Sequence, residues 1–437
     1  MKKILGISTV ILLFSVFQLS AQTNSGTTLT IGIPEQSNFS SERLARIDKI
    51  VQQYVDSGWI NGAIALVARN GKIVYYKGLG YDDKEQKQPM KKDAIFRIAS
   101  QTKAITSVAI MQLVEEGKIL LDDQIWKYIP GFRMPVVLDK FNPKDSSYTT
   151  VPAKKEITIR DLMTHTSGIG YAQIGAPQMN AIYAKAGVYG GIGLPAGTKL
   201  STNILRLAKL PLMHSPGEKW TYGLNTDVLG YLVEVLTGLS LDEYFKKKIF
   251  EPLGMKDTYF YIPKEKQSRL ANLYAEDSLQ HIVKMPETIQ LNGNFYRDYP
   301  NIKDGSFYSG GGGLVSTAYD YAIFMQMLLN GGDYNGKHIL SKASIRLMTT
   351  NQIGNLSRNG SNGLDTKFGL GFELVTAGNY GKNYCSMDTY SWGGMFASSY
   401  WIDPKEKIVA QFVLQMLPAS HGDINEKFKV QVYEALQ

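Results

Sequence analysis

Cysteine is almost absent from this sequence: Cys385 is the only one among 437 residues. One cysteine excludes a disulfide within the chain, so the fold must depend on its hydrophobic core. With 44% hydrophobic residues, the chain is long enough to bury such a core as one large domain or as two closely packed ones. We expect Cys385 to be a passive or mildly exposed thiol.

Several motifs of common enzyme classes are missing as well. No H-E-x-x-H or similar spacing occurs among the histidines, so the sequence predicts no metal site and no other cofactor. No Gly-Lys-Ser or Gly-Lys-Thr follows the glycine run 310–313, which favours tight packing beside a cleft over a phosphate cradle. The absence of G-x-S-x-G argues against an α/β-hydrolase fold.

Charge of one sign is not concentrated in any segment. The formal net charge is +8, and no dense stripe of Lys and Arg occurs. This mild excess favours solubility and anionic neighbours such as cell-envelope polymers, and it argues against a nucleic-acid partner.

Only one long hydrophobic run is present, from Ile4 to Phe17, directly behind the positive tip formed by residues 1–3. It falls short of the roughly 20 residues that a membrane-spanning helix needs. Small residues follow it as far as Ala21, and no nearby cysteine can carry a lipid. The pattern predicts a signal peptide over residues 1–21, no stable membrane anchor, and a periplasmic or secreted mature protein.

The order of the expected elements indicates how the rest of the chain folds. Residues 22–40 are polar and predict a flexible lead-in. Strands expected near both ends of residues 41–437 imply one antiparallel sheet built from the two termini and flanked by helices, an α/β fold with a mainly helical lobe inserted at approximately 121–301. The expected strands are 63–68, 73–77, 95–98, 368–375, 389–392, 398–402 and 408–414, and the expected long helices are 41–58, 102–116, 226–236 and 424–436.

Ser100 stands at the mouth of the helix expected from residue 102, and Lys103 follows three residues later. This spacing places both side chains on one helical face. A lysine in a partly desolvated site is disfavoured in its charged form, so it can accept or orient the proton of a hydroxyl, and the helix N-terminus favours negative charge nearby. Ser-x-x-Lys also occurs by chance on exposed helices, so further segments must support a catalytic interpretation.

Several segments, in the same order along the chain, resemble the serine β-lactamase and penicillin-binding protein superfamily. The resemblance covers roughly residues 41–417 and implies a β-lactamase/DD-peptidase-like fold, with Ser100 as nucleophile and Lys103 and Tyr222 handling the proton. The matching segments are Phe96 to Lys103, Leu162 to Gly168, Pro216-Gly217 before Trp220 and Tyr222, Glu251 to Met255, and Gly310 to Leu329. In this resemblance, His165 and Ser167 belong to loop architecture, because the mechanism of the superfamily uses no histidine triad.

The sequence departs from this superfamily just after Tyr222. The usual pattern is Tyr-x-Asn, whereas here Leu224 takes the third place and Asn225 comes one position later. Asn225 either contacts substrate in place of the usual asparagine or caps the helix that begins at Thr226. In the second case the amide that contacts a substrate amide is missing.

A second departure lies in the late strand that usually reads Lys-Thr-Gly or His-Thr-Gly, which Ser391 to Met395 fits best. Gly393 and Gly394 allow a substrate to approach the backbone closely. The resemblance implies an oxyanion hole made by the backbone N–H groups of Ser100 and Met395. Trp392 replaces a cation that helps to hold a carboxylate, and Trp-Gly-Gly resembles the family VIII esterases, the branch similar to class C β-lactamases.

Three functions remain open on this basis. The first is hydrolysis of small-molecule esters, the second is β-lactamase or D-Ala-type peptidase action on amides such as cell-wall peptides, and the third is a non-catalytic, penicillin-recognising envelope module. Trp392 and Leu224 favour esters over lactams. The intact set of Ser100, Lys103 and Tyr222 favours an enzyme over a binding module.

Overall fold

The computed structural model describes residues 27–290, 294–358 and 365–437. The predicted signal peptide therefore lies outside the described residues. The expected flexible lead-in is wrong for residues 27–40, because this stretch packs on the domain. Leu29 and Phe39 are buried, and strand β1 (Thr30–Ile31) pairs with one strand of the main sheet, β3 (Lys72–Asp83). Many of its polar side chains remain exposed, among them Thr30, Glu35 and Gln36, which is why the composition suggested a free segment.

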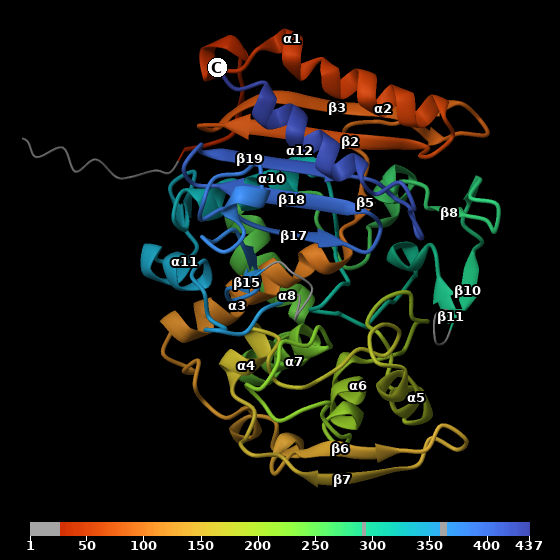
Figure 1. Ribbon diagram of the computed structural model, residues 1–437, viewed down its shortest axis with the longest axis vertical. Coiled ribbons are helices and arrows are strands. Elements are labelled where there is room, and N and C mark those ends of the chain that lie inside the picture. Colours follow the sequence, from red (N-terminus) through yellow and green to blue (C-terminus); the bar gives the residue numbers. More distant parts are fainter. Residues whose placement is uncertain (1–26, 291–293, 359–364) are drawn as a thin grey trace, which may run out of the picture.

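One sheet joins the two ends of the chain, which confirms the expected fold class (Figure 1). The strand order is β1-β3-β2-β19-β18-β17-β16-β15, with β4 paired to β3. Every pair is antiparallel except β1 with β3. The strands are β2 Gly62–Arg69, β3 Lys72–Asp83, β4 Gln88–Pro89, β15 Lys367–Phe368, β16 Glu373–Leu374, β17 Tyr390–Gly394, β18 Ser398–Asp403 and β19 Ile408–Val413.

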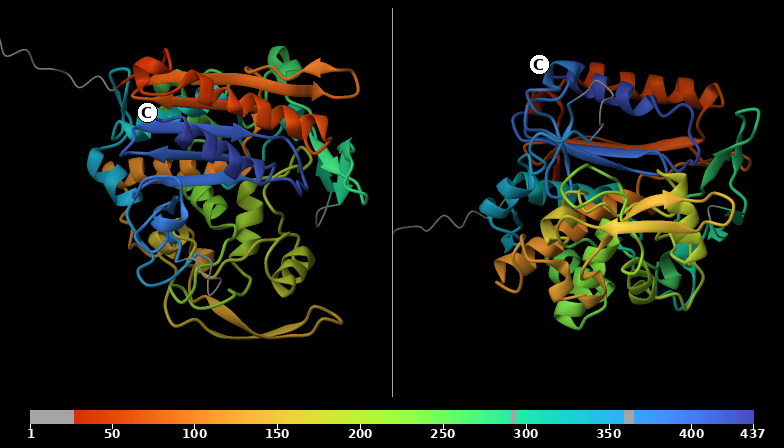
Figure 2. Two further views of the ribbon diagram at one scale, coloured as in Figure 1. Left: turned by 45° about the horizontal axis from the view of Figure 1, so that its top comes forward. Right: turned by 60° about the horizontal axis from the view of Figure 1, so that its bottom comes forward.

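Helices cover both faces of this sheet (Figure 2). On one face α2 (Arg46–Asp56) and α12 (Ile424–Glu434) bury Val51 and Phe428 against Phe412. On the other face α3 (Thr102–Glu115) and α10 (Ala318–Leu329) pack against the opposite side chains of the same strands. Because β2 and β19 are buried on both faces, their sequences are almost continuously apolar. Each fully buried large apolar side chain contributes about 1.5–3 kcal/mol.

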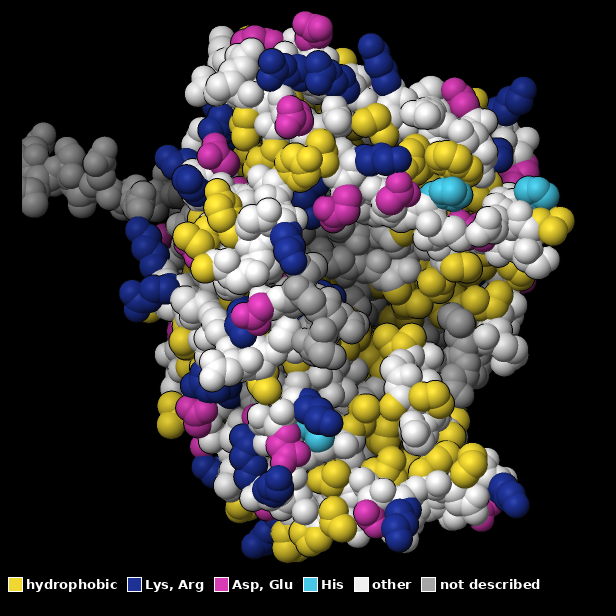
Figure 3. Space-filling model, in the orientation of Figure 1, with side chains coloured by type: hydrophobic (Ala, Val, Ile, Leu, Met, Phe, Trp, Pro, Cys, Tyr) yellow, Lys and Arg dark blue, Asp and Glu magenta, His cyan; other side chains and the backbone are white. Residues whose placement is uncertain are grey.

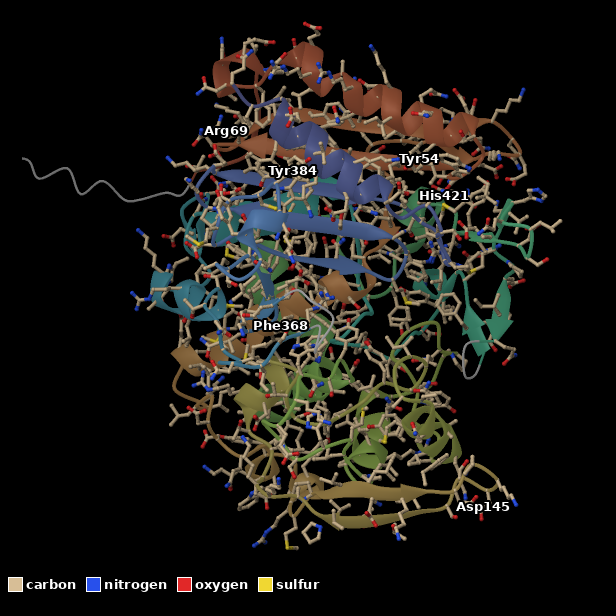
Figure 4. The ribbon with its side chains drawn as sticks, in the orientation of Figure 1. Tyr54, Arg69, Asp145, Phe368, Tyr384 and His421 are labelled. Atoms are coloured by element: carbon tan, nitrogen blue, oxygen red, sulfur yellow. The ribbon has the colours of Figure 1, made fainter. Side chains whose placement is uncertain are left out.

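The lobe below the sheet is less purely helical than expected. Its hairpins have short, mostly exposed strands, so they carry no hydrophobic alternation that a sequence pattern could reveal. Figure 4 shows Asp145 at the tip of the longest hairpin, β6–β7, far from the sheet. The hairpins of residues 121–301 are β6 Val136–Phe141 with β7 Tyr148–Pro152, β8 Tyr274–Glu276 with β9 Ile282–Lys284, and β10 Thr288–Gln290 with β11 Asn294–Tyr296.

Most of the other helices and strands are short; the exception is α7 (Asn225–Thr237). The expected helix 41–58 is divided in two, and the expected strand 368–375 turns at Gly369 to Gly371 into two strands, β15 and β16. None of the described helices is long and apolar enough to cross a membrane. The remaining elements are α1 Ser41–Leu44, β5 Phe96–Arg97, α4 Ile159–Met163, α5 Pro177–Lys185, α6 Leu200–Leu207, α7 Asn225–Thr237, α8 Leu241–Phe245, α9 Glu251–Leu253, β12 Val315–Ser316, β13 Asp333–Tyr334, β14 Lys337–His338 and α11 Lys342–Met348.

Cys385 lies close to Lys429 and Tyr433 of α12, and its side chain is buried rather than mildly exposed. Burial raises the pKa of its thiol. Because the thiol form is both shielded and favoured, Cys385 fits the passive role that was expected.

Asp320 makes stability depend on pH in a predictable direction. It is buried in the first turn of α10 and accepts hydrogen bonds from the Asp257 N–H (2.6 Å) and Thr258 Oγ1 (3.1 Å). Burial raises its pKa to about 6, so the folded protein keeps a proton that the unfolded chain releases near pH 4. The stability from this proton is complete below pH 4 and is lost as pH rises through 6, by about 3 kcal/mol in order of magnitude.

Asp320→Asn should remove this loss. Urea unfolding of both proteins at pH 4.5 and 6.5 measures it: the variant should gain stability relative to the parent as pH rises. A difference that stays constant or shrinks with pH would show that Asp320 ionises normally.

Candidate active site

Ser100 sits in a tight turn between β5 and α3 that the fold holds firmly. The turn is a 3-10 segment, Ala99–Gln101. Ala99 has φ +45°, in the left-handed region that a non-glycine residue adopts at a cost of roughly 1–3 kcal/mol. The neighbouring Arg97 is fully buried and donates to the carbonyls of Arg297 (2.9 and 2.7 Å) and Ala271 (2.9 Å). These bonds fix the strand that leads into the strained turn.

The structure brings Ser100, Lys103 and Tyr222 into contact. Tyr222 Oη donates to Ser100 Oγ at 2.6 Å, and Lys103 Nζ donates to the same oxygen at 3.2 Å. Tyr222 lies just before α7, whereas the other two residues belong to the turn and helix below the sheet. Residues separated by more than 100 positions thus meet at one hydroxyl group.

Lys103 is buried, and its ammonium group has a complete set of partners. Besides Ser100, Nζ donates to the Gly311 carbonyl at 2.6 Å and to Tyr171 Oη at 3.4 Å. It also lies 4.8 Å from the ring centre of Tyr222. A buried charge without such partners would be strongly unfavourable. Burial raises the pKa of Tyr171 well above its usual value, so Tyr171 keeps its proton beside this ammonium group.

Asp227 stands behind this group and was missed by the sequence motifs. Its Oδ1 accepts from Ser309 Oγ at 2.6 Å and from the Gly311 N–H at 3.4 Å, so the Gly311 peptide lies between Asp227 and Lys103. A Cβ at Gly311 would meet Asp227 Oδ2 at 2.4 Å, which explains the tight glycine run. Burial raises the pKa of Asp227, and the nearby Lys103 charge acts in the opposite direction. Tyr171 and Asp227 both lie near recognised motifs, but nothing in their own spacing distinguishes them.

Asn225 does not reach the cleft, so its assignment as a substrate-binding residue is wrong. It is fully buried in the first turn of α7, and its amide donates to His165 Nδ1 at 2.9 Å while its oxygen accepts from Ser167 Oγ at 2.5 Å. It does not cap the helix either, since Leu224 holds that position without a side-chain bond. Burial lowers the pKa of His165 well below its usual value and keeps the ring neutral. The three residues form loop architecture.

The late strand β17 lies along the turn that carries Ser100. A Cβ at Gly394 would meet the Ile98 carbonyl at 2.6 Å, so only glycine allows this approach. Trp392, Gly393, Gly394 and Met395 all line one cleft with Ser100. The structure therefore places the predicted oxyanion-hole and glycine positions beside the predicted nucleophile.

This cleft has a volume of about 840 Å³ and opens between the sheet and the lower lobe, where hydrophobic side chains border a hollow (Figure 3). Such a volume suits a small organic ligand. Trp220 stacks on Tyr222 with ring centres 6.0 Å apart, and Trp392 lies 5.6 Å from the same ring. The two indoles hold the Tyr222 ring in place. Among the described residues, no group of three or more His, Cys, Asp and Glu side chains could hold a metal ion.

Known proteins of one family match most of this chain. The β-lactamase family model matches residues 47–431. The chain belongs to the β-lactamase family. It is accordingly a serine hydrolase of the β-lactamase and penicillin-binding protein superfamily.

Relatives within this family include a named esterase. Protein Rv1367c of Mycobacterium tuberculosis is 32% identical over 380 residues, covering 84% of this chain and 89% of that protein. Esterase EstB of Burkholderia gladioli is 34% identical over 283 residues, covering 63% of this chain and 67% of EstB. Among solved structures, EstCE1, described as a hydrolase with promiscuous acyltransferase activity, has a TM-score of 0.75 and 26% identity, covering 90% of this chain and 99% of EstCE1.

The structural role of Asn225 is testable by substitution. Asn225→Leu leaves Ser167 Oγ and His165 Nδ1 buried without their partner, which should lower the free energy of unfolding by about 1–3 kcal/mol. Urea unfolding measures the loss, and KM for a hydrolysed ester should change little. Unchanged stability together with a raised KM would return Asn225 to substrate binding.

Proposed function

We propose that this protein is an exported serine hydrolase that cleaves carboxylic esters through an acyl-enzyme on Ser100. The observation that carries the proposal is the pair of contacts to Ser100 Oγ, from Tyr222 Oη at 2.6 Å and Lys103 Nζ at 3.2 Å, on the wall of a largely apolar cleft. A serine hydroxyl needs such a neighbouring base to become a nucleophile.

In the proposed reaction, Tyr222 acts as a phenolate, whose negative charge is stabilised by the Lys103 ammonium group 4.8 Å from the ring centre. Ser100 Oγ attacks the ester carbonyl as its proton passes to the phenolate oxygen of Tyr222, which becomes a neutral phenol. The N–H groups of Ser100 and Met395 donate to the carbonyl oxygen, each worth about 3 kcal/mol in the transition state. The C–O bond to the leaving alkoxide breaks, and Tyr222 returns the proton to it.

The second half of the cycle uses the same groups in reverse. Water attacks the acyl ester of Ser100 while Tyr222 accepts its proton, and the departing Ser100 oxygen takes that proton back. The acid product leaves, and the starting arrangement is restored. No cofactor enters this balance.

Two features favour esters over amides as substrates. Trp392 occupies the strand position that bears a cation in related lactamases and peptidases, and Asn225 turns its amide into the loop of His165 instead of the cleft. A substrate amide therefore lacks the side-chain partner that the superfamily usually offers. The names of EstB and EstCE1 agree with an ester substrate.

Residues 1–21 support the view that the enzyme acts outside the cytoplasm. Their positive tip, apolar run and small residues up to Ala21 are typical of a secretory signal peptide. Small esters of the cell surroundings are then the substrates, with cell-wall peptides as the alternative.

Hydrolysis of p-nitrophenyl acetate and butyrate beside nitrocefin tests the reaction. The mature protein should cleave the esters much faster than the lactam. Ser100→Ala and Tyr222→Phe should each lower kcat by at least about a thousandfold, as expected for groups acting in the transition state, while keeping the thermal unfolding midpoint. Tyr384→Phe, a substitution at an exposed tyrosine (Figure 4), serves as the matched control and should keep full activity.

Other results point to the alternatives. Faster cleavage of nitrocefin than of either ester would make the protein a β-lactamase. Complete lack of Ser100-dependent turnover would contradict the enzyme proposal for these substrates and favour an envelope binding module.

A further inference from the structure

Two oppositely charged pairs contribute to the wall of the cleft. Lys429 pairs with Glu426 at 3.0 Å on α12, and Arg358 pairs with Glu373 of β16 at 2.6 Å. All four side chains line the cleft that contains Ser100. Lys103, the remaining cation near Ser100, is buried and engaged with Ser100, Gly311 and Tyr171. A charge-reading role toward a substrate must therefore come from one of the two pairs.

Arg358 is the cation that belongs to the reacting end of the cleft. Its guanidinium carbon lies 4.8 Å from the ring centre of Trp392 and 5.7 Å from that of Trp220. Both indoles also flank Tyr222, which bonds to Ser100. Arg358 thus lies over the same aromatic layer that positions the proposed base.

A further ring packs against both indoles of this aromatic layer. The Phe368 ring packs edge-on against Trp392 at 5.3 Å and against Trp220 at 5.6 Å. Phe368 belongs to β15, the edge strand of the sheet, and Figure 4 shows it on the side of the sheet nearer the lower lobe. A guanidinium held over two indoles by cation–π contact loses less side-chain freedom on binding a ligand than an arginine without such contacts.

The chemistry of this group selects carboxylates. A guanidinium offers five donors in a planar fork that matches a carboxylate. Glu373 engages Nη1 through Oε2, which demonstrates carboxylate binding at this position within the chain itself. The side chains are 30% and 31% exposed, so an incoming carboxylate can reach the guanidinium and compete with Glu373. Partial exclusion of water strengthens such a pair relative to one on an open surface.

We propose that Arg358, stacked on Trp392, forms an anion-binding subsite and that the preferred substrates are esters whose acyl part carries a carboxylate. Trp392 occupies a strand position that bears a cation in related enzymes. Arg358, which lies 34 positions earlier on a different segment, supplies a cation instead. Glu373 is the internal competitor that an anionic substrate displaces. This proposal rests on the proposed ester hydrolysis at Ser100.

The test compares two esters that differ in one terminal group. Mono-p-nitrophenyl glutarate carries a carboxylate where p-nitrophenyl pentanoate has a methyl group, and both acyl chains have five carbons. The parent enzyme should prefer the glutarate, measured as the ratio of the two kcat/KM values. Arg358→Gln should lower this ratio by about tenfold or more, the effect of one hydrogen-bonded charge pair, whereas Glu373→Gln should raise it.

Arg133→Gln is the matched control. Arg133 also stacks on an indole, with its guanidinium carbon 5.0 Å from the Trp126 ring centre, but it does not line the cleft. Its substitution should leave the ratio unchanged. Thermal unfolding midpoints of all variants separate a loss of folding from a loss of selectivity.

The outcomes distinguish this proposal from the one on which it rests. Hydrolysis of both esters with a ratio that Arg358→Gln leaves unchanged, or that Arg133→Gln lowers equally, would overturn the subsite. Absence of hydrolysis would contradict the ester reaction alone, and the subsite is then judged by calorimetric titration of the Ser100→Ala protein with mono-p-nitrophenyl glutarate. Adding Arg358→Gln to the Ser100→Ala protein should weaken this binding about tenfold. Equal binding by the single and the double variant would overturn the subsite.

Discussion

The buried ammonium group of Lys103 is the constraint around which the site is organised. A charge in the protein interior is tolerated only when polar partners surround it. Here the partners come from the turn that carries Ser100, from the glycine run at 310–313, and from Tyr171 in the lower lobe. The sheet-covering helices and the inserted lobe must therefore pack in one arrangement, since a shift of either would leave the charge without partners.

The same packing decides how close β17 comes to the nucleophile. Gly394 lies against the Ile98 carbonyl, and the left-handed Ala99 bends the chain so that Ser100 faces the cleft. The Arg97 side chain holds the preceding strand through three hydrogen bonds that it donates to backbone carbonyls. The contacts of the neighbouring residues thus hold Ala99 in its strained conformation. As a result, the Ser100 hydroxyl group faces the cleft from a well-anchored turn.

The aromatic layer of Trp220, Tyr222, Trp392 and Phe368 gives the cleft its chemical character. Its rings pack around the phenol that contacts Ser100 and give this wall of the cleft an apolar surface. Replacement of a strand cation by Trp392 removes a point charge but creates a surface on which a guanidinium can lie. If Arg358 forms the proposed subsite, Trp392 in the strand motif changes the position of the positive charge in the cleft and does not remove that charge. The strand motif of such a hydrolase is then an incomplete guide to its substrate.

Hydrophobic runs were enough to predict the sheet from both termini and the flanking helices, because these patterns are local. The ordered motifs singled out Ser100, Lys103 and Tyr222, whose side chains the structure brings into contact. Local patterns could not place Asn225. Its amide is hydrogen-bonded to His165 and Ser167, which lie in a loop about 60 positions earlier. They also gave no sign of Tyr171, Asp227 or Arg358 beside the site. These side chains act through neighbours brought close only by packing, and contacts between distant segments leave no periodic trace in the sequence.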